Sequence, residues 1–388
     1  MMLLLGTLVL CLSGSVLSDQ QLKLVHVVFS HKLYAPIKIN EDNTYTYPEK
    51  LDYKYFLEST DDMVNSAKMD MYNLGVYLRK NYNSFLGEIF HPDLMRTRTT
   101  EYPLSMISGL LVNTGLWPPA EAQVWQSGLN WQPVPTDYIS AKRDTLLLGS
   151  LCPGFSEDEK KAQIALRSLK HESLYSSATK SYGSVIKTPS DVALLSSVFQ
   201  TIVDSNMSLP AWASDLSTDI SELTFLSYDQ LANTERQKKL NGGTLLKKII
   251  SDSLTHQESN GTSKLKIIMY SAEDRNIIGL LKNINLWSPH YLSSTTALIF
   301  ETYNDTLTNK YSLKMMFYSY NETVPFKLKN CDQYCPLDKF SNELKNVLPE
   351  NVTALCEEIS NASPIPIINL VLLFILLSMT MINIYSNF

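Results

Sequence analysis

Short apolar runs along the chain indicate a buried β-sheet. Leu22–Phe29 (LKLVHVVF) is continuous and rich in β-branched residues, which is typical of a strand covered on both faces within a parallel sheet. Similar runs return only in the last third of the chain, at Leu265–Tyr270, Thr295–Thr302 and Tyr311–Tyr318. If these strands share one sheet, the long segment between them must supply the elements that cover it.

Apolar residues recur at helical spacing within that long segment. The spacing predicts helices in Thr60–Leu86, in Leu104–Asn113 and in a charge-rich block over residues 156–257, which includes Glu157–Leu174 and Leu245–Leu254. The order of strand, helices, helical block and strands predicts an α/β fold with a mainly parallel sheet flanked by helices. We expect residues 19–155 and 258–358 to form the core and residues 156–257 to form an inserted helical cap domain.

Both ends of the chain carry apolar segments that suggest targeting. The stretch Met2–Leu12, followed by small residues, predicts a secretory signal peptide over residues 1–18. Residues 365–385 contain no charged side chain and have the length of a bilayer span, with only three residues after them. Three interpretations stay open for this segment: a single transmembrane anchor, the signal for a lipid anchor, and a buried core helix.

Composition narrows the cellular setting. The formal net charge is −6 and no long basic run occurs, so we expect no nucleic-acid partner. Six Asn-X-Ser/Thr sites predict a glycosylated extracellular or lysosomal surface: Asn206, Asn260, Asn304, Asn321, Asn351 and Asn361.

Cysteine usage agrees with an oxidising compartment. Removal of the signal peptide leaves four cysteines, Cys152, Cys331, Cys335 and Cys356, which allow three pairings. The spacing of Cys331 and Cys335 could form half of a metal site, but neither a second cysteine pair nor a histidine lies nearby. A local disulfide is therefore favoured, and we expect no metal and no cofactor.

The turn after the first strand is the first place to look for chemistry, because ligands bind at the carboxyl ends of strands in open α/β sheets. It reads Ser30-His31-Lys32-Leu33-Tyr34-Ala35-Pro36 and resembles the Arg-His-Gly-X-Arg-X-Pro motif of the histidine acid phosphatases. A second family motif, Tyr-Ser-Ala-His-Asp, is similar to Tyr270-Ser271-Ala272-Glu273-Asp274. The segment Cys331–Leu337 resembles the C-terminal disulfide segment of insect members such as the venom acid phosphatase-like proteins. The resemblance implies pairing of Cys152 with Cys356 and of Cys331 with Cys335.

The resemblance assigns the two chemical roles of the family to residues that this chain keeps. His31 matches the nucleophile that attacks phosphorus and becomes a phosphohistidine, and Asp274 matches the proton donor to the leaving oxygen. Asp274 could equally be the N-terminal cap of a helix that begins at Arg275.

The phosphate clamp of the family, which is three arginines and the histidine of the second motif, is mostly replaced. Arg98 matches one clamp arginine and is the predicted phosphate-binding residue, whereas Ser30, Tyr34 and Glu273 occupy the other positions. Losing one oxyanion donor typically costs about 10²- to 10³-fold in rate. We expect Glu273 and Arg98 to form an ion pair that fills the old phosphate site. Lys32 and Arg275 are either solvated surface charges or replacement cations.

Two functions follow as hypotheses. The first is a catalytically impaired phosphatase-like ectodomain, a pseudophosphatase anchored at the membrane with a binding role. The second is an active acid phosphatase that hydrolyses phosphomonoesters through a phosphohistidine. The expected partners are a phosphomonoester or another small anionic ligand and a membrane, and a homodimer stays open.

Overall fold

The computed structural model describes residues 20–32, 37–42, 44–52, 63–166, 171–259, 261–293 and 295–357. In this part of the chain, eight strands form one sheet in the order β10-β8-β7-β1-β6-β4-β5, with β9 beside β8. The strands are β1 (Gln20–His31), β4 (Met95–Thr99), β5 (Asp137–Tyr138), β6 (Ile267–Ala272), β7 (Thr295–Asp305), β8 (Tyr311–Ser319), β9 (Glu322–Phe326) and β10 (Cys335–Pro336).

The sheet is mixed. Strands β1, β6, β4 and β5 run parallel, whereas β7, β8, β9 and β10 are joined by antiparallel pairs, and β7 is antiparallel to β1. The predicted α/β class and the four predicted strands are confirmed, and the parallel half of the sheet contains the two motifs that resemble those of the histidine acid phosphatases.

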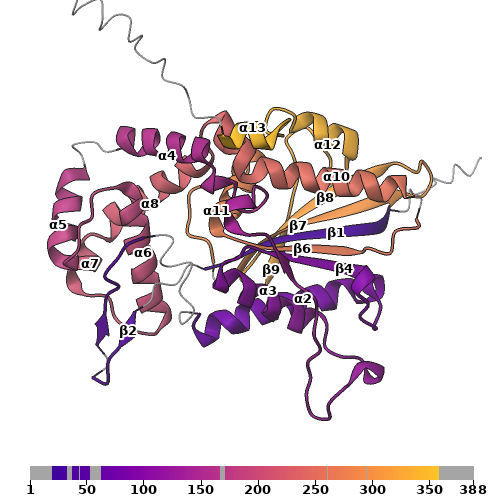
Figure 1. The fold of residues 1–388 in the computed structure, drawn as a ribbon, viewed down its shortest axis with the longest axis horizontal. Helices are drawn as coiled ribbons and strands as arrows, with labels where there is room; N and C mark the ends of the chain where they lie inside the picture. The colour runs from indigo at the N-terminus through magenta and orange to yellow at the C-terminus, as the bar shows by residue number, and fades with distance from the viewer. Residues whose placement is uncertain are drawn as a thin grey trace, which may run out of the picture.

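Helices cover both faces of the sheet (Figure 1). Helices α2 (Asn65–Leu86) and α3 (Pro103–Leu116) cover one face, where they bury the side chains of Val25, Val27 and Phe29. The opposite face buries Leu24 and Val28 under a second group of helices: α10 (Thr244–Glu258), α11 (Asp274–Asn283) and α12 (Leu337–Glu343). Alternate residues of β1 therefore enter two separate cores, which explains the continuous apolar run.

A second helical cluster lies beside the sheet, on the left of Figure 1. Its apolar core comes from four helices: α5 (Glu172–Tyr182), α6 (Pro189–Asp204), α7 (Ala211–Asp215) and α8 (Ser217–Asp229). The hairpin of β2 (Lys38–Ile39) and β3 (Tyr45–Thr46) lies against these helices, and the Tyr182 hydroxyl donates a hydrogen bond to the Pro48 carbonyl oxygen at 2.8 Å. We call these helices and this hairpin the cap.

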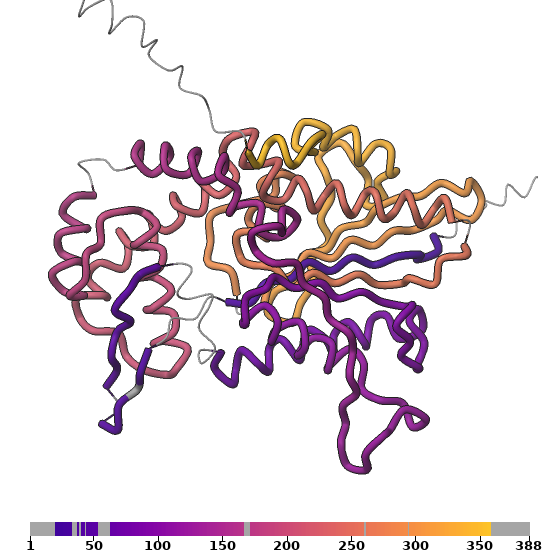
Figure 2. The backbone as a smooth tube through the Cα atoms, viewed as in Figure 1, coloured from indigo at the N-terminus to yellow at the C-terminus, as the bar shows by residue number. Residues whose placement is uncertain are grey.

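The cap differs in extent from the helical block expected over residues 156–257. Helix α10 belongs to that block in sequence but packs on the sheet, whereas the hairpin precedes the block and packs on the cap. The range Glu157–Leu174, expected as one helix, contains most of α4 (Pro153–Leu166) and the start of α5, and residues 167–170 lie outside the described part of the chain. Figure 2 shows the chain passing from the sheet to the cap and back. Sequence periodicity marks helices, but it does not show which core a helix joins.

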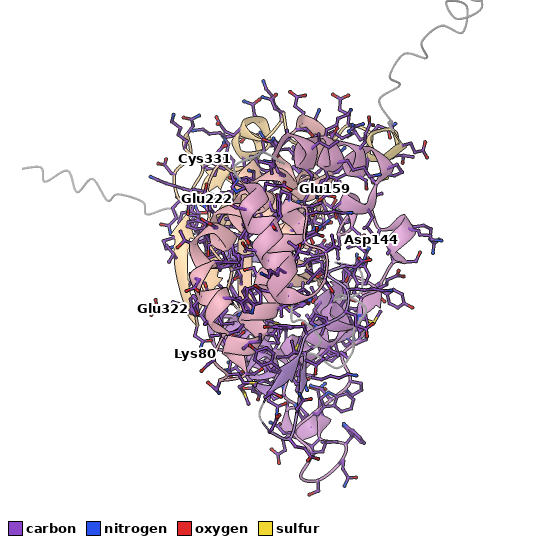
Figure 3. All side chains as sticks on the ribbon, turned by 90° about the vertical axis from the view of Figure 1, so that its left-hand side faces the viewer. Lys80, Asp144, Glu159, Glu222, Glu322 and Cys331 are labelled. Carbon is purple, nitrogen blue, oxygen red and sulfur yellow. A yellow bond between two sulfur atoms is a disulfide. The ribbon has the colours of Figure 1, made fainter. Side chains whose placement is uncertain are left out.

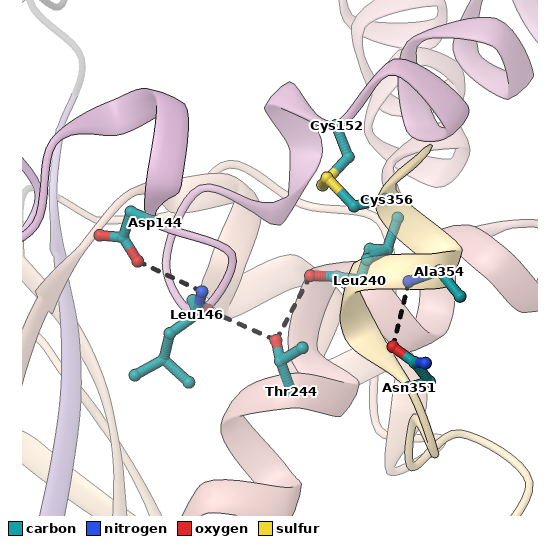
Figure 4. Close-up of a disulfide and its surroundings, with 8 residues drawn as sticks. All are labelled: Asp144, Leu146, Cys152, Leu240, Thr244, Asn351, Ala354 and Cys356. Carbon is teal, nitrogen blue, oxygen red and sulfur yellow. Dashed lines mark hydrogen bonds between the residues drawn. A yellow bond between two sulfur atoms is a disulfide. The ribbon is translucent and has the colours of Figure 1, made fainter. Parts of the chain in front are cut away.

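Two disulfides join the segments that the resemblance implied. Cys152, beside the start of α4, pairs with Cys356 in α13 (Val352–Glu357), across a sequence separation of 204 (Figure 4). Cys331 pairs with Cys335 beside β10. Both predicted pairings are confirmed. The long-range bridge fixes the C-terminal helix to the segment that leads from the core into α4.

Several predicted features lie outside the described residues: residues 1–18, residues 365–385, Tyr34, Asn260 and Asn361. Within the part of the chain that the structure describes, none of the helices combines the length and the apolarity that a bilayer crossing requires. The side chains of Asn206, Asn321 and Asn351 are exposed and that of Asn304 is half-buried. Their glycosylation stays a prediction.

Candidate active site

Three parallel strands end together and bring both sequence motifs to one edge of the sheet. Ser30 of β1 lies opposite Ala272 of β6, and Ser271 of β6 lies opposite Thr99 of β4. The residues that follow these positions are therefore neighbours although they are far apart in sequence. This is the edge at which ligands bind in α/β sheets.

His31 is the last residue of β1, and its side chain lies on the floor of a cavity. It is 2% exposed, and neither ring nitrogen has a hydrogen-bond partner among the described residues. Burial lowers the pKa of His31 to about 4, against the opposing effect of the Asp274 carboxylate. The ring is therefore neutral at physiological pH, as a nucleophile must be.

Glu273 lies directly beside His31. Its Oε2 is 3.5 Å from His31 Nε2, while its Oε1 accepts a hydrogen bond from the Thr100 hydroxyl at 3.0 Å. The backbone amide of Glu273 donates to Asn276 Oδ1 at 3.0 Å, which fixes the residue at the start of α11. Burial raises the pKa of Glu273 to about 7, against the effects of the Thr100 hydrogen bond and the Arg275 charge. A protonatable carboxyl group thus lies next to His31, the predicted nucleophile.

Asp274 begins α11, and its carboxylate interacts electrostatically with His31. Burial raises its pKa to about 6, while the Ser30 hydroxyl and the charges of His31 and Lys32 oppose this rise. The carboxyl group is protonated in mild acid, which suits a proton donor. The expectation that Asp274 is the N-cap of a helix starting at Arg275 is wrong, because the helix starts one residue earlier and Glu273 is its N-cap.

The predicted ion pair between Arg98 and Glu273 is wrong. Arg98 Nη2 lies 2.8 Å from Oδ2 of the fully buried Asp144, and Glu273 pairs with His31 instead. The reason is the alternation of β4. Thr97 donates a hydrogen bond to Asn113 of α3, so Arg98 extends from the opposite face of the sheet toward the loop that contains Asp144. The phosphate-binding role of Arg98 stays a prediction.

The loop around Asp144 holds the carboxylate of this residue in place with backbone hydrogen bonds. Asp144 Oδ1 accepts hydrogen bonds from the backbone amides of Leu146 at 3.2 Å and Leu147 at 3.0 Å, so the carboxylate is fixed before it meets Arg98. Figure 4 shows Asp144 and Leu146 on this loop, and Figure 3 labels Asp144. Arg98 is not among the residues that line the cavity at His31.

The two candidate replacement cations behave differently. Lys32 donates hydrogen bonds to Asp204 at 2.5 Å and to Gln200 at 3.3 Å. Its ammonium group is therefore paired with side chains of α6 in the cap. It lines a small neighbouring cavity, together with Tyr228 and Asp274. Arg275 lines the cavity at His31.

The cavity at His31 has a volume of about 550 Å³ and lies between the core and the cap. Besides the motif residues, its lining includes Asp52, Glu159 and Asp191, which sequence reasoning did not select. They come from the segment after the cap hairpin, from α4 and from α6. Because these carboxylates share no motif and are separated by long stretches of chain, only the folded arrangement brings them together.

The family model described as histidine phosphatase superfamily (branch 2) matches residues 21–318 of this chain. The chain belongs to this family. His31 at the end of β1 and Asp274 just after β6 therefore lie within the fold of this family, as the sequence motifs implied.

Curated relatives extend the comparison over most of the chain. The venom acid phosphatase of Apis mellifera is 28% identical over 348 residues, which cover 87% of this chain and 88% of the relative. The prostatic acid phosphatase of Homo sapiens is 28% identical over 363 residues, which cover 89% and 90%. Among solved structures, the apo form of Hafnia alvei phytase has a TM-score of 0.60 at 15% identity and covers 88% of this chain and 99% of its own. That structural likeness supports the histidine phosphatase fold.

Proposed function

We propose that this protein is a histidine acid phosphatase-like ectodomain whose catalysis is impaired and whose cavity has a binding role. The observation that carries the proposal is the carboxyl group of Glu273, which lies 3.5 Å from the ring of His31 in a buried site. A phosphoryl group that approaches His31 Nε2 must occupy space next to this carboxyl group. Above a pH of about 7, the carboxyl group is ionised and repels a phosphate dianion.

The surroundings of His31 support the same proposal. Phosphoryl transfer depends on cationic donors that stabilise the charge of the transferring oxygens. Ser30 provides a hydroxyl group, Lys32 is paired with Asp204, and Arg98 is paired with Asp144. Arg275 is the permanently charged side chain that lines the cavity in the described part of the chain. One guanidinium stabilises the transferring oxygens less than the family clamp of three arginines and one histidine.

The cellular setting is also part of the proposal. The relatives include a venom acid phosphatase and lysosomal acid phosphatases, for example that of Xenopus laevis, 27% identical over 303 residues. The signal-like residues 1–18, the sequons and the two disulfides support entry into the secretory pathway. We include membrane attachment through residues 365–385 in the proposal, because this segment is uncharged and long enough for a bilayer.

One observation favours the alternative, an active acid phosphatase that hydrolyses phosphomonoesters through a phosphohistidine. The pKa values of the three site residues leave a window between about pH 4 and about pH 6. In this window His31 is neutral and nucleophilic, Asp274 is protonated and can donate, and Glu273 is protonated and no longer repels phosphate. Any remaining phosphatase activity should therefore be confined to acid conditions.

Hydrolysis of p-nitrophenyl phosphate by the full-length protein between about pH 4 and about pH 8 separates the two functions. We expect a kcat/KM on the order of 10⁴-fold or more below that of a venom or prostatic acid phosphatase assayed in parallel. Ordinary turnover in mild acid that disappears in His31→Ala, together with a trapped phosphohistidine, would establish the active enzyme instead.

A further inference from the structure

The charges around the cavity at His31 have the opposite sign from those that a phosphate ligand needs. Among the described residues, one guanidinium and five carboxyl groups line it: Arg275 and Asp52, Glu159, Asp191, Glu273 and Asp274. Figure 3 views the molecule from the side of the cap and labels Glu159. A concave surface lined by one sign of charge concentrates ligands of the opposite sign.

Nearby cations do not reverse this balance. The ammonium group of Lys32 is bound by Asp204 and Gln200 of α6, and the guanidinium of Arg98 is paired with Asp144. Neither Lys32 nor Arg98 is among the residues that line this cavity. Arg275 therefore faces an excess of carboxyl groups.

The floor of the cavity contains buried polar atoms that make no hydrogen bond within the described part of the chain, although His31 Nε2 lies 3.5 Å from Glu273 Oε2. His31 is 2% exposed and Ser150 is 4% exposed, and both line the cavity. Both ring nitrogens of His31, Ser150 Oγ and Asp274 Oδ1 have no hydrogen-bond partner among the described residues. Buried polar atoms are normally satisfied by protein, water or ligand. The His31 and Ser150 atoms are independent of the count of carboxyl groups and indicate a place where a ligand binds.

The chemistry of these atoms selects the ligand. A carboxylate only accepts hydrogen bonds, and a neutral imidazole accepts at one ring nitrogen. An alkylammonium group has three donors and no acceptor, so it complements such a floor. A phosphate dianion is itself an acceptor and finds few donors here.

Apolar side chains form one part of the walls, and uncharged polar residues form another: Ser156, Gln163, Thr188, Ser190, Ser197 and Ser227. Six side chains face the cavity with hydrocarbon or aromatic surface: Leu51, Leu151, Leu194, Tyr228, Leu231 and Ile278. The volume of about 550 Å³ lies within the range of small-molecule sites, which are mostly apolar with a few placed polar groups. The ring of Tyr228 adds a surface that attracts cations.

We propose that this cavity binds a small organic cation, a primary amine whose ammonium group lies at His31, Glu273 and Asp274. The hydrocarbon part of the amine packs against the apolar walls. This inference rests on the proposed function, since it names the ligand class for the binding role of the same site.

Calorimetric titration of the full-length protein in a non-ionic detergent, at low salt and about pH 7.5, tests the proposal with three probes. The probes are 2-phenylethylamine, its neutral isostere 2-phenylethanol, and inorganic phosphate. We expect the amine to bind at least about tenfold more tightly than the alcohol and phosphate to bind more weakly than the amine. Equal affinity for amine and alcohol, or tighter binding of phosphate, would overturn it.

A pair of variants on α4 provides a matched control. Glu159 lines the cavity, whereas Glu157 is not among the lining residues and pairs with Lys161 at 2.8 Å. Glu159→Gln should weaken the amine about three- to tenfold, and Glu157→Gln should leave its affinity within about twofold. Asp52→Asn repeats the test on another wall, should Glu159→Gln fail to fold. Equal effects of the lining and control variants would contradict the proposal.

Turnover of p-nitrophenyl phosphate on the same samples keeps the two proposals apart. Ordinary acid phosphatase rates would refute the impaired-enzyme proposal whatever the amine does. Absence of both turnover and amine binding would refute only the ligand class proposed for the cavity.

Discussion

Replacing Glu273 with glutamine removes the charge next to His31, the predicted nucleophile, with little change in side-chain shape. The carboxyl group is 2% exposed, its Oε2 is 3.5 Å from His31 Nε2, and its Oε1 is bound by the Thr100 hydroxyl. A glutamine amide has the same size and its oxygen can accept the same hydrogen bond. Because the pKa of Glu273 is raised to about 7, the substitution changes the charge mainly above that pH.

The expected magnitude follows from the geometry. Two unit charges about 4 Å apart at an effective dielectric constant near 20 interact with about 4 kcal/mol. The Arg275 charge and water in the open cavity reduce this repulsion. We expect Glu273→Gln to raise kcat/KM for p-nitrophenyl phosphate about 10- to 100-fold near pH 8 and less than about threefold near pH 5.

The assay is a pH profile of kcat/KM for the wild type, Glu273→Gln and the control Glu157→Gln. Calorimetric affinity for inorganic phosphate provides a second measurement that does not depend on turnover. A similar gain at pH 5 and pH 8, or no gain at pH 8 in either measurement, would refute the reasoning that an ionised Glu273 excludes phosphate.

The same substitution should change stability with a definite sign. A carboxyl group whose pKa rises from 4.5 in the unfolded chain to about 7 in the fold costs stability as pH increases through this interval. The full difference corresponds to about 3 kcal/mol above pH 7 and vanishes below about pH 4.5. Glu273→Gln should therefore raise the melting temperature about 2–5 °C at pH 8 and leave it unchanged at pH 4. A rise of equal size at both pH values would contradict this account.

Three further outcomes are expected. The combination of Ser30→Arg, Tyr34→Arg and Glu273→His should increase kcat/KM by more than the product of the separate effects, because clamp residues act as a unit. Steady-state kinetics of all combinations test this, and simple multiplication of the separate effects would show that it is wrong. Cys356→Ser removes the long-range disulfide and should lower the free energy of unfolding by about 4 kcal/mol. Denaturant unfolding measures this change, and an unchanged unfolding midpoint would argue against a structural role of the disulfide. A chain that ends at Ser360 should leave the detergent phase, whereas the full-length protein should stay in it, and equal partitioning would remove the anchor from the proposal.

The sequence was sufficient for the fold class because the strands are marked by their own composition. The apolar run of β1 and the later strands could be identified without the structure, since each is buried on both faces or pairs within the core. The end of β1 pointed to His31, whereas Asp274, which follows the end of β6, came from the family resemblance. Parallel neighbours β1 and β6 necessarily bring those ends together.

The partners of the charged residues could not be read in this way. Arg98 and Glu273 both belong to motif segments, but β4 directs Arg98 to Asp144, and α11 directs Glu273 to His31. A long charged side chain can form an ion pair with any opposite charge within a few ångströms, and the tertiary structure determines which charges lie within that distance. That choice depends on side-chain direction and on loops such as the one at Asp144.

The sequence by itself determined the α/β core and, through family likeness, the two disulfide pairings, whereas the replacement of clamp residues around His31 and Asp274 stays a prediction from that likeness. These features depend on local composition, on strand ends and on motif spacing. Only the tertiary structure decided the sign of charge in the cavity, because Asp52, Glu159 and Asp191 come from three segments without a shared pattern. It also decided that Glu273 lies against His31, since that contact exists only where two distant strands end side by side.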